Sequence, residues 1–340
     1  MKTSKSPRKV LLTAYAVARE SLPAYAHRCS PKKFTQHQLF ACLVLKTMLK
    51  LDYRGAAETL GDWPELRERI GLKGVPHFTT LHKAAARLLV AWLVRRVMDR
   101  LVEWAVRAKL LKPKVTPLAA GDSSGFESHH ISRYFVKRRE RGGKTSGKWH
   151  TTTYRRFPKL GVVVDCKSHL VFAAVTMRGP SPDHGHVDDL MVQAHGRRVI
   201  DTALLDAGYD AEWTHRLLRH DLGIRSLIPP KIGRPTAKKP AGRYRRLMAR
   251  LLSGSQRGKP YGQRVQVETV FSMIKRRLGE SLGARSYHAQ NRAMMLMVLT
   301  HDLMILRRHK RGFLQSNIVS LIRRKPKAPD EALADDGHLF

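Results

Sequence analysis

Three acidic residues are placed where carboxylates could hold metal ions. Asp122 comes directly after residues 115–121, which are typical of a short strand. Asp206 comes directly after a second such segment, residues 202–205, and Glu268 lies in a segment with helical periodicity. Hard oxygen ligands of this kind suit Mg²⁺ or Mn²⁺ and not zinc. Two such ions about 3.5–4 Å apart can activate the attacking oxygen and stabilise the leaving oxygen in phosphoryl transfer.

Residues 261–279 are predicted to form a helix that carries Glu268 on a polar stripe. At 100° per residue, three further side chains lie within about 40° of Glu268: Tyr261, Arg264 and Lys275. An apolar stripe beside them predicts the contact with a core: Val267, Val270, Phe271, Ile274 and Leu278. Cations beside a carboxylate suit phosphate contacts around a metal ligand. The alternative is a solvated face with ordinary i,i+4 pairing of Arg264 with Glu268.

The overall charge narrows the kind of partner. The chain has 340 residues, with 64 Lys and Arg against 27 Asp and Glu, so its formal net charge is +37. This excess points to a polyanion, most simply nucleic acid, and a ribosomal-type binder or a merely basic proteome are the alternatives. A hydrophobic fraction of 42% excludes wholesale disorder. No run of 18 apolar residues exists, which excludes a transmembrane protein.

The cysteines and the first residues bear on compartment. Three cysteines without paired spacing exclude a disulfide scaffold and a cysteine-type zinc site, and they indicate a reducing compartment. Residues 1–18 imitate a signal peptide, but Arg19 and Glu20 follow the short apolar run at once. We therefore expect a helix of the mature protein at this position.

Helices are predicted for residues 34–49, 53–60 and 64–70, followed by one long helix from Thr79 or Thr80 to residue 108. Short helices joined by tight turns are typical of a helix-turn-helix DNA-binding module and equally of any small helical bundle. Both interpretations stay open.

From residue 113 onward the pattern predicts a mixed α/β layer. We expect a strand at 115–121, a hairpin of 160–164 and 170–177, a helix at 187–196, a strand at 202–205, a helix at 211–220 and a strand at 224–228. Acidic residues follow two of these strands, at the edge where open α/β sheets place their chemistry.

Two basic segments are predicted to contact DNA without reading its sequence. Residues 129–159 indicate an exposed loop or ribbon, and residues 231–260, which contain no acid, indicate a linker or loop. A Met-rich helix is expected at 290–308, with its methionines in the core. The tail from residue 325 is predicted to be disordered.

Two histidine pairs and one tryptophan are weaker candidates. His129 with His130, and His184 with His186, have no obvious set of further ligands, so we interpret them as exposed loop residues. Trp213 could stack on an extruded base, but a buried helix-face position is favoured.

The sequence resembles bacterial insertion-sequence transposases of the DDE class over roughly residues 34–310. Their signature of Tyr, two residues, Arg, three residues, Glu, six residues and Lys is matched without a departure in spacing by Tyr261, Arg264, Glu268 and Lys275. The GDSS run at 121–124 and the DAGYD run at 206–210 are also similar to the family's contexts for its first two acids.

The resemblance implies an α/β fold: a ribonuclease-H-like mixed sheet flanked by helices, with an N-terminal helical domain. Residues 1–112 would form a helical DNA-binding or dimerisation domain, and 113–310 the catalytic domain, with a short basic insertion at about 231–260. Residues 311–340 would be a partly disordered tail. The family often inserts a β-rich segment where this chain has only 231–260.

The resemblance also assigns roles to residues. It implies two divalent ions, Mg²⁺ or Mn²⁺, and catalytic metal ligands at Asp122, Asp206 and Glu268. It implies contacts to the phosphates of the transposon end from Tyr261, Arg264 and Lys275.

The function implied is a DNA transposase that cleaves insertion-sequence ends and joins their 3′-OH to target DNA. The expected partners are terminal inverted repeats, target DNA and a second copy of the chain in a paired-end complex, with no membrane. The expected location is the bacterial cytoplasm, in association with the nucleoid. The alternatives are a non-catalytic, domesticated or decayed sequence-specific DNA-binding protein, and a related metal-dependent nuclease without strand transfer.

Overall fold

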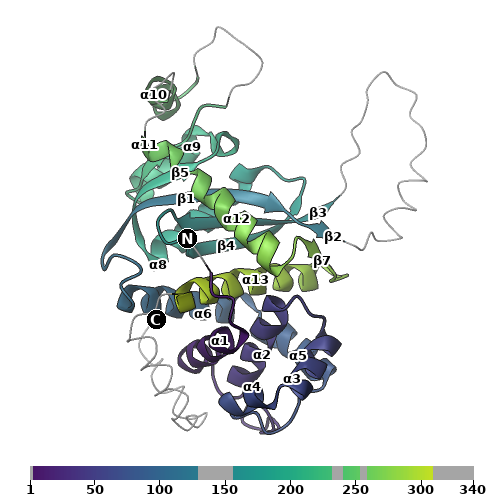
Figure 1. Ribbon diagram of the computed structural model, residues 1–340. Helices are drawn as coiled ribbons and strands as arrows, with labels where there is room; N and C mark the ends of the chain where they lie inside the picture. The colour runs from purple at the N-terminus through teal and green to yellow at the C-terminus, as the bar shows by residue number, and fades with distance from the viewer. Residues whose placement is uncertain (1–2, 129–155, 232–239, 253–258, 309–340) are drawn as a thin grey trace, which may run out of the picture.

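A computed structural model describes residues 3–128, 156–231, 240–252 and 259–308 (Figure 1). The predicted ribbon at 129–159 lies almost wholly outside the described residues, as do His129, His130 and the tail.

The centre of the fold is a five-stranded mixed sheet with the order β4-β3-β1-β5-β6. Its strands are β1 (Val115–Gly125), β3 (Phe157–Asp165), β4 (Val171–Gly179), β5 (Val199–Leu205) and β6 (Arg225–Leu227). The strand β3 runs antiparallel to both of its neighbours, β1 and β4, whereas β5 and β6 continue parallel to β1. A second, two-stranded sheet pairs β2 (Glu127–Ser128) with β7 (Ser281–Leu282). The predicted mixed sheet is therefore confirmed.

The predicted hairpin is β3 with β4. Valines 162–164 are buried on β3, as expected for a central strand rich in β-branched residues. Its turn is closed where the Ser168 backbone N–H donates to Asp165 Oδ2 at 2.6 Å.

Helices cover this sheet. The helix α8 (Val187–Arg197) packs against β3, β4 and β5, and α12 (Val265–Leu278) lies across β1 and β3 (Figure 1). The 3₁₀ turn η1 (Asp183–His186) precedes α8.

The amino-terminal region is helical, as predicted. Its helices are α1 (Pro7–Ser21), α2 (Gln36–Met48), α3 (Tyr53–Asp62), α4 (Pro64–Arg69), α5 (Phe78–Leu88) and α6 (Ala91–Arg107). The prediction of one helix from Thr79 to residue 108 is wrong, because Val90 is extended (φ −84°, ψ 152°) and separates α5 from α6.

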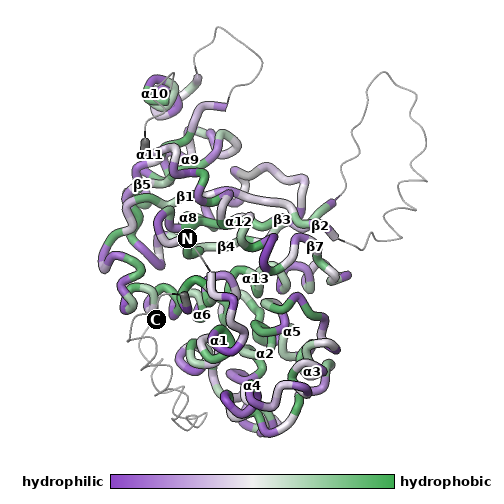
Figure 2. The backbone as a smooth tube through the Cα atoms, viewed as in Figure 1, coloured by the Kyte–Doolittle hydropathy of each residue, from purple (hydrophilic) through white to green (hydrophobic). Residues whose placement is uncertain are grey.

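The long helix α13 (Tyr287–Arg308) joins the two regions. It contacts α1, α2, α5 and α6 as well as β3 and β4. Three of its methionines are buried, as predicted: Met294, Met297 and Met304. Figure 2 shows hydrophobic segments concentrated where α13 meets its neighbours. The division into domains at residues 112 and 310 stays a prediction.

The prediction of an irregular linker at 231–260 is wrong in part. It contains α10 (Arg243–Leu251) and the start of α11 (Lys259–Gly262). Neighbouring helix α9 (Glu212–Arg216) is followed by a π-helical turn, η3 (Leu217–Asp221), and preceded by a 3₁₀ turn, η2 (Ala207–Tyr209). Across the described ranges, we find no helix with the length and hydrophobicity needed to cross a bilayer.

Candidate active site

Adjacent strands bring Asp122 and Asp206 together. The last parallel pair between β1 and β5 joins Gly121 to Leu205, and the two aspartates are the next residues on these strands. The prediction that Asp122 follows the end of its strand is wrong. The strand β1 continues to pair with β3 beyond this residue, and Asp122 lies opposite Val162. A Cβ atom at Gly121 would lie 2.5 Å from Leu205 Cδ2, so glycine leaves room here for the Leu205 side chain.

The helix α12 positions Glu268. All five residues of its predicted apolar stripe are buried: Val267, Val270, Phe271, Ile274 and Leu278. The prediction of one helix over 261–279 is wrong at its start, since α11 ends at Gly262 and Arg264 is the N-cap of α12. Backbone N–H groups of Gln263 and Arg264 bond three residues back, to Pro260 and Tyr261, and this tight turn keeps the signature residues close together.

Arg264 lies between two of the predicted metal ligands. Its Nη1 donates to Asp122 Oδ2 at 3.1 Å, and its Nη2 donates to Glu268 Oε1. Burial acts to lower the pKa of Arg264, but the charges of Asp122, Tyr261, Asp206 and Glu268 outweigh it and raise this pKa. The side chain of Glu268 is 52% exposed and that of Asp122 is 21% exposed, so water and solutes reach both carboxylates.

Tyr261 and Lys275 contact the same two strands. The Tyr261 hydroxyl donates to the carbonyl oxygen of Leu205 at 3.3 Å, one residue before Asp206. Lys275 Nζ donates to Ser124 Oγ at 2.8 Å, two residues after Asp122. All six predicted site residues therefore gather at one edge of the sheet.

The donor chemistry of this edge fits a divalent cation, because carboxylate oxygens are the ligands that Mg²⁺ and Mn²⁺ prefer. In the conformation described, however, no three His, Cys, Asp or Glu residues of the described ranges are grouped as metal ligands. The guanidinium of Arg264 instead bridges Asp122 and Glu268, and it offsets part of their charge.

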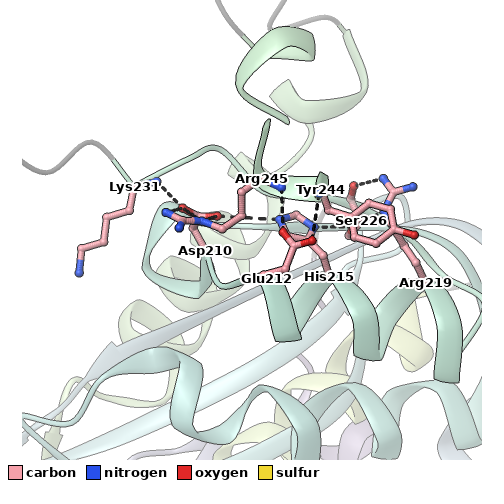
Figure 3. A network of polar contacts seen from close by, with 8 residues as sticks. All are labelled: Asp210, Glu212, His215, Arg219, Ser226, Lys231, Tyr244 and Arg245. Carbon is pink, nitrogen blue, oxygen red and sulfur yellow. Dashed lines mark hydrogen bonds and ion pairs between the residues drawn. The ribbon is translucent and has the colours of Figure 1, made fainter. Parts of the chain in front are cut away.

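Sequence reasoning missed a second polar network four residues beyond Asp206 (Figure 3). Asp210 pairs with Arg245 of α10, with Nη2 to Oδ2 at 2.8 Å and Nε to both oxygens at 3.0 Å. Burial acts to raise the pKa of Asp210, but the neighbouring His215 and the hydrogen bonds from Arg245 and the Lys231 backbone lower it to about 2. Asp210 belongs to the DAGYD run, but its partner is 35 residues away, so local pattern could not reveal the pair.

Two weaker candidates have separate outcomes. The prediction that Trp213 is buried is wrong, since it is 44% exposed. The short helix α9 instead turns Thr214 and His215 inward. His184 is exposed and His186 half-buried in η1, and neither belongs to a metal-binding group among the described residues.

Comparisons with known proteins bear on the family. The sequence model of the family described as "Transposase DDE domain" matches residues 115–303, more than half of the chain. A chain in the crystal structure of the Mos1 strand transfer complex is similar over 93% of this chain and 82% of that chain. It is 14% identical with a TM-score of 0.28, too low to carry an argument. No curated protein matches the sequence. From the model that matches residues 115–303, which hold all six site residues, the chain belongs to the family of transposases with a DDE domain.

Proposed function

We propose that this transposase cleaves the ends of an insertion sequence and joins the liberated 3′-OH to target DNA. The observation that carries the proposal is the placement of Asp122 and Asp206 one step beyond the last β1–β5 pair, with Glu268 tied to Asp122 through Arg264. Carboxylates from two neighbouring strands and a helix are what metal-assisted phosphoryl transfer needs.

Transposases with this domain generally use divalent metal ions. Asp122, Asp206 and Glu268 would hold two of them, Mg²⁺ or Mn²⁺. When bound, such ions stabilise the charge that develops on the attacking and leaving oxygens. Arg264, which bridges Asp122 and Glu268, and Lys275, which bonds to Ser124, would bind phosphates of the DNA end, and the Tyr261 hydroxyl would donate to a phosphate oxygen.

Two successive displacements at phosphorus complete the reaction. In the first, water loses a proton as its oxygen bonds to phosphorus, and the 3′-oxygen leaves as a hydroxyl. In the second, that 3′-OH loses its proton as its oxygen bonds to the phosphorus of a target phosphodiester, whose own 3′-oxygen leaves and takes up a proton as a hydroxyl. The chain's part is to position the phosphodiester and neutralise its charge, which supply most of the rate.

A cleavage and joining assay tests this proposal. The substrate is a plasmid carrying the gene with its natural flanking DNA, with Mg²⁺ or with EDTA, and the variants are D122N, D206N and E268Q. Each should lower strand cleavage by at least about 10²–10³-fold while leaving DNA binding largely intact. Asp201 on the same strand as Leu205 is exposed, and D201N is the matched control that should keep full activity.

Other outcomes would overturn the proposal in defined ways. Full cleavage by any of the three variants would remove that residue from the site. Nicked DNA without joined product would identify a nuclease without strand transfer. DNA binding with no metal-dependent cleavage by the wild-type chain would identify a non-catalytic DNA-binding protein.

We also propose a homodimer in a paired-end complex, because two ends must be joined in one event. Light scattering coupled to size exclusion should give a mass of two chains with two DNA ends. One chain on one end under cleaving conditions would contradict this.

A further inference from the structure

The helix α10 divides its four arginines between two opposite tasks. Arg245 points to Asp210, and the remaining three are exposed: Arg243, Arg246 and Arg250. At 100° per residue these three fall within a sector of about 60°, and Arg245 lies about 100° or more from each of them. The helix therefore uses one arginine as an anchor and presents a stripe of three to solvent.

The anchor is built from two acids at the start of α9: Asp210, two residues before this helix, and Glu212, its first residue. Glu212 accepts the backbone N–H groups of Tyr244 at 3.1 Å and Arg245 at 3.2 Å, and so caps the amino-terminus of α10. Gly242 precedes the helix at φ +96°, and a Cβ there would lie 2.2 Å from Glu212 Oε2, so glycine is required for this approach.

The network continues into the sheet. Buried His215 bonds through Nδ1 to Ser226 Oγ on β6 at 2.8 Å, and its Nε2 lies 3.9 Å from Asp210 Oδ1. Figure 3 shows this chain of contacts from Ser226 through His215 and Asp210 to Arg245. The position of α10 is thus fixed relative to the sheet edge that carries Asp206.

We propose that the arginine stripe of α10, formed by Arg243, Arg246 and Arg250, binds the phosphate backbone of duplex DNA beside the carboxylate site. Charge complementarity carries this choice of partner. No Asp or Glu occurs in residues 231–260, and the whole chain carries +37. From Arg243 to Arg250 a helix rises about 10.5 Å, which spans about three phosphates of one DNA strand. Figure 1 shows α10 standing out from the rest of the described chain, above α9.

Asp210 and Glu212 are positioning residues in this arrangement. They follow Asp206 by four and six residues and hold α10 near that end of the sheet. A duplex whose scissile phosphate lies at the carboxylates would therefore contact the stripe. This inference deepens the proposed function and rests on it for the presence of DNA at that edge.

Fluorescence anisotropy with a labelled 30-base-pair duplex of random sequence tests the stripe without any cleavage. The triple variant R243Q/R246Q/R250Q should bind about 10- to 100-fold more weakly than wild type at 150 mM salt. The slope of log K against log salt should fall in magnitude by about 2.7, which corresponds to three lost phosphate contacts. The triple lysine variant should keep the slope, because three positive charges remain.

A matched control removes the same charge elsewhere. Lys109, Lys112 and Lys114 are exposed just before β1, at the opposite end of this strand from Asp122. K109Q/K112Q/K114Q should change the affinity by less than about 3-fold. An equal loss in this control, or an unchanged slope in the arginine triple variant, would overturn the assignment. Polyglutamate serves as a probe for an acidic protein. If the arginine triple variant lost binding to polyglutamate while its duplex binding stayed unchanged, the stripe would bind a protein partner instead.

The anchor is tested by D210N, which keeps the whole stripe. Amide hydrogen exchange in 243–251 should become faster, and duplex affinity should fall by about 3- to 10-fold. Faster exchange with unchanged affinity would overturn the positioning role of Asp210. These readouts need no catalysis, so an inactive wild-type chain would refute the proposed function and leave the test of the stripe valid.

Discussion

Two arginine–carboxylate pairs at the same end of the molecule share their chemistry and differ in their surroundings. Arg245 meets Asp210 at 2.8 Å, and Arg264 meets Asp122 at 3.1 Å. The carboxylate of Asp210 has no exposed surface, whereas Asp122 is 21% exposed and Glu268, the other partner of Arg264, is 52% exposed.

The number of donors separates the pairs further. Asp210 accepts bonds from Arg245 and from the Lys231 backbone and lies beside His215, so its partners are held in place by the fold. Arg264 is shared between Asp122 and Glu268 at a surface that solutes can reach. A sealed pair stabilises one arrangement, whereas an accessible pair can exchange its partners for a cation and a phosphate.

The largest predicted contrast comes from replacing the carboxylate with an amide at two aspartates four residues apart. D206N should lower cleavage by about 10²–10³-fold with little change in stability. D210N should lower stability by about 1–3 kcal/mol, because Arg245 loses its charged partner. Urea unfolding and single-turnover cleavage measure the two effects. The distinction between the pairs fails if D206N and D210N give the same profile.

Lowering the pH should remove the stability contributions of the buried histidines and of the Asp210–Arg245 pair over different pH ranges. Burial lowers the pKa of His37 and of His301 to about 4, below the usual 6.5, and hydrogen bonds offset this only in part. The unfolded chain binds protons first as pH falls, so each histidine should cost about 2 kcal/mol of stability between pH 7 and pH 5.

Asp210 behaves differently over that range. Its pKa is lowered to about 2, so its contribution is present above pH 4 and is lost only as pH falls toward 2. The difference in unfolding free energy between wild type and D210N should therefore be equal at pH 7 and pH 5. A difference that shrinks before pH 5 would show that Asp210 is not held ionised.

Removing each arginine tests whether its pair can accept a cation. R264A leaves Asp122, Asp206 and Glu268 without their shared counter-charge and should cost about 1 kcal/mol in metal-free buffer. Millimolar Mg²⁺ should then raise the melting temperature of R264A by more than that of wild type, by about 2–4 °C. R245A should be destabilised too, but Mg²⁺ should not restore it. An equal response of R264A and R245A would mean that the pairs do not differ in access.

The sequence was informative wherever the cause of structure is local. The buried stripe of α12 follows from helical period, and the hairpin of β3 and β4 follows from valine-rich runs around a polar turn. The position of two acids after apolar runs and the polar stripe of residues 261–279 predicted that three carboxylates converge, and the family resemblance added the other three site residues.

The sequence could not reveal features that depend on contacts between residues far apart in the chain. The break between α5 and α6 at Val90 has no glycine or proline to mark it. The helix α10 forms in a segment rich in arginine and proline because Asp210 and Glu212, more than 30 residues away, anchor its first turn. The place of Arg264 between two carboxylates depends on how α12 lies over β1, which helical period alone does not specify.

The smallest predicted effect concerns two tyrosines, one in each region. Tyr261 donates to the Leu205 carbonyl at 3.3 Å, one residue before Asp206, and the Tyr244 hydroxyl lies 2.8 Å from His220 Nε2 in the α10 anchor. Each phenylalanine variant removes one hydroxyl, which is worth about 0.5–1.5 kcal/mol. Y261F should slow single-turnover cleavage at saturating protein by about 3- to 10-fold, beyond the small fall in melting temperature that the loss of one hydrogen bond causes. Y244F should leave that rate unchanged and speed amide exchange in α10, because its hydroxyl serves only the anchor. Equal rates for the two variants would place Tyr261 outside the reacting site, and the accessible region would then be reduced to its carboxylates and cations.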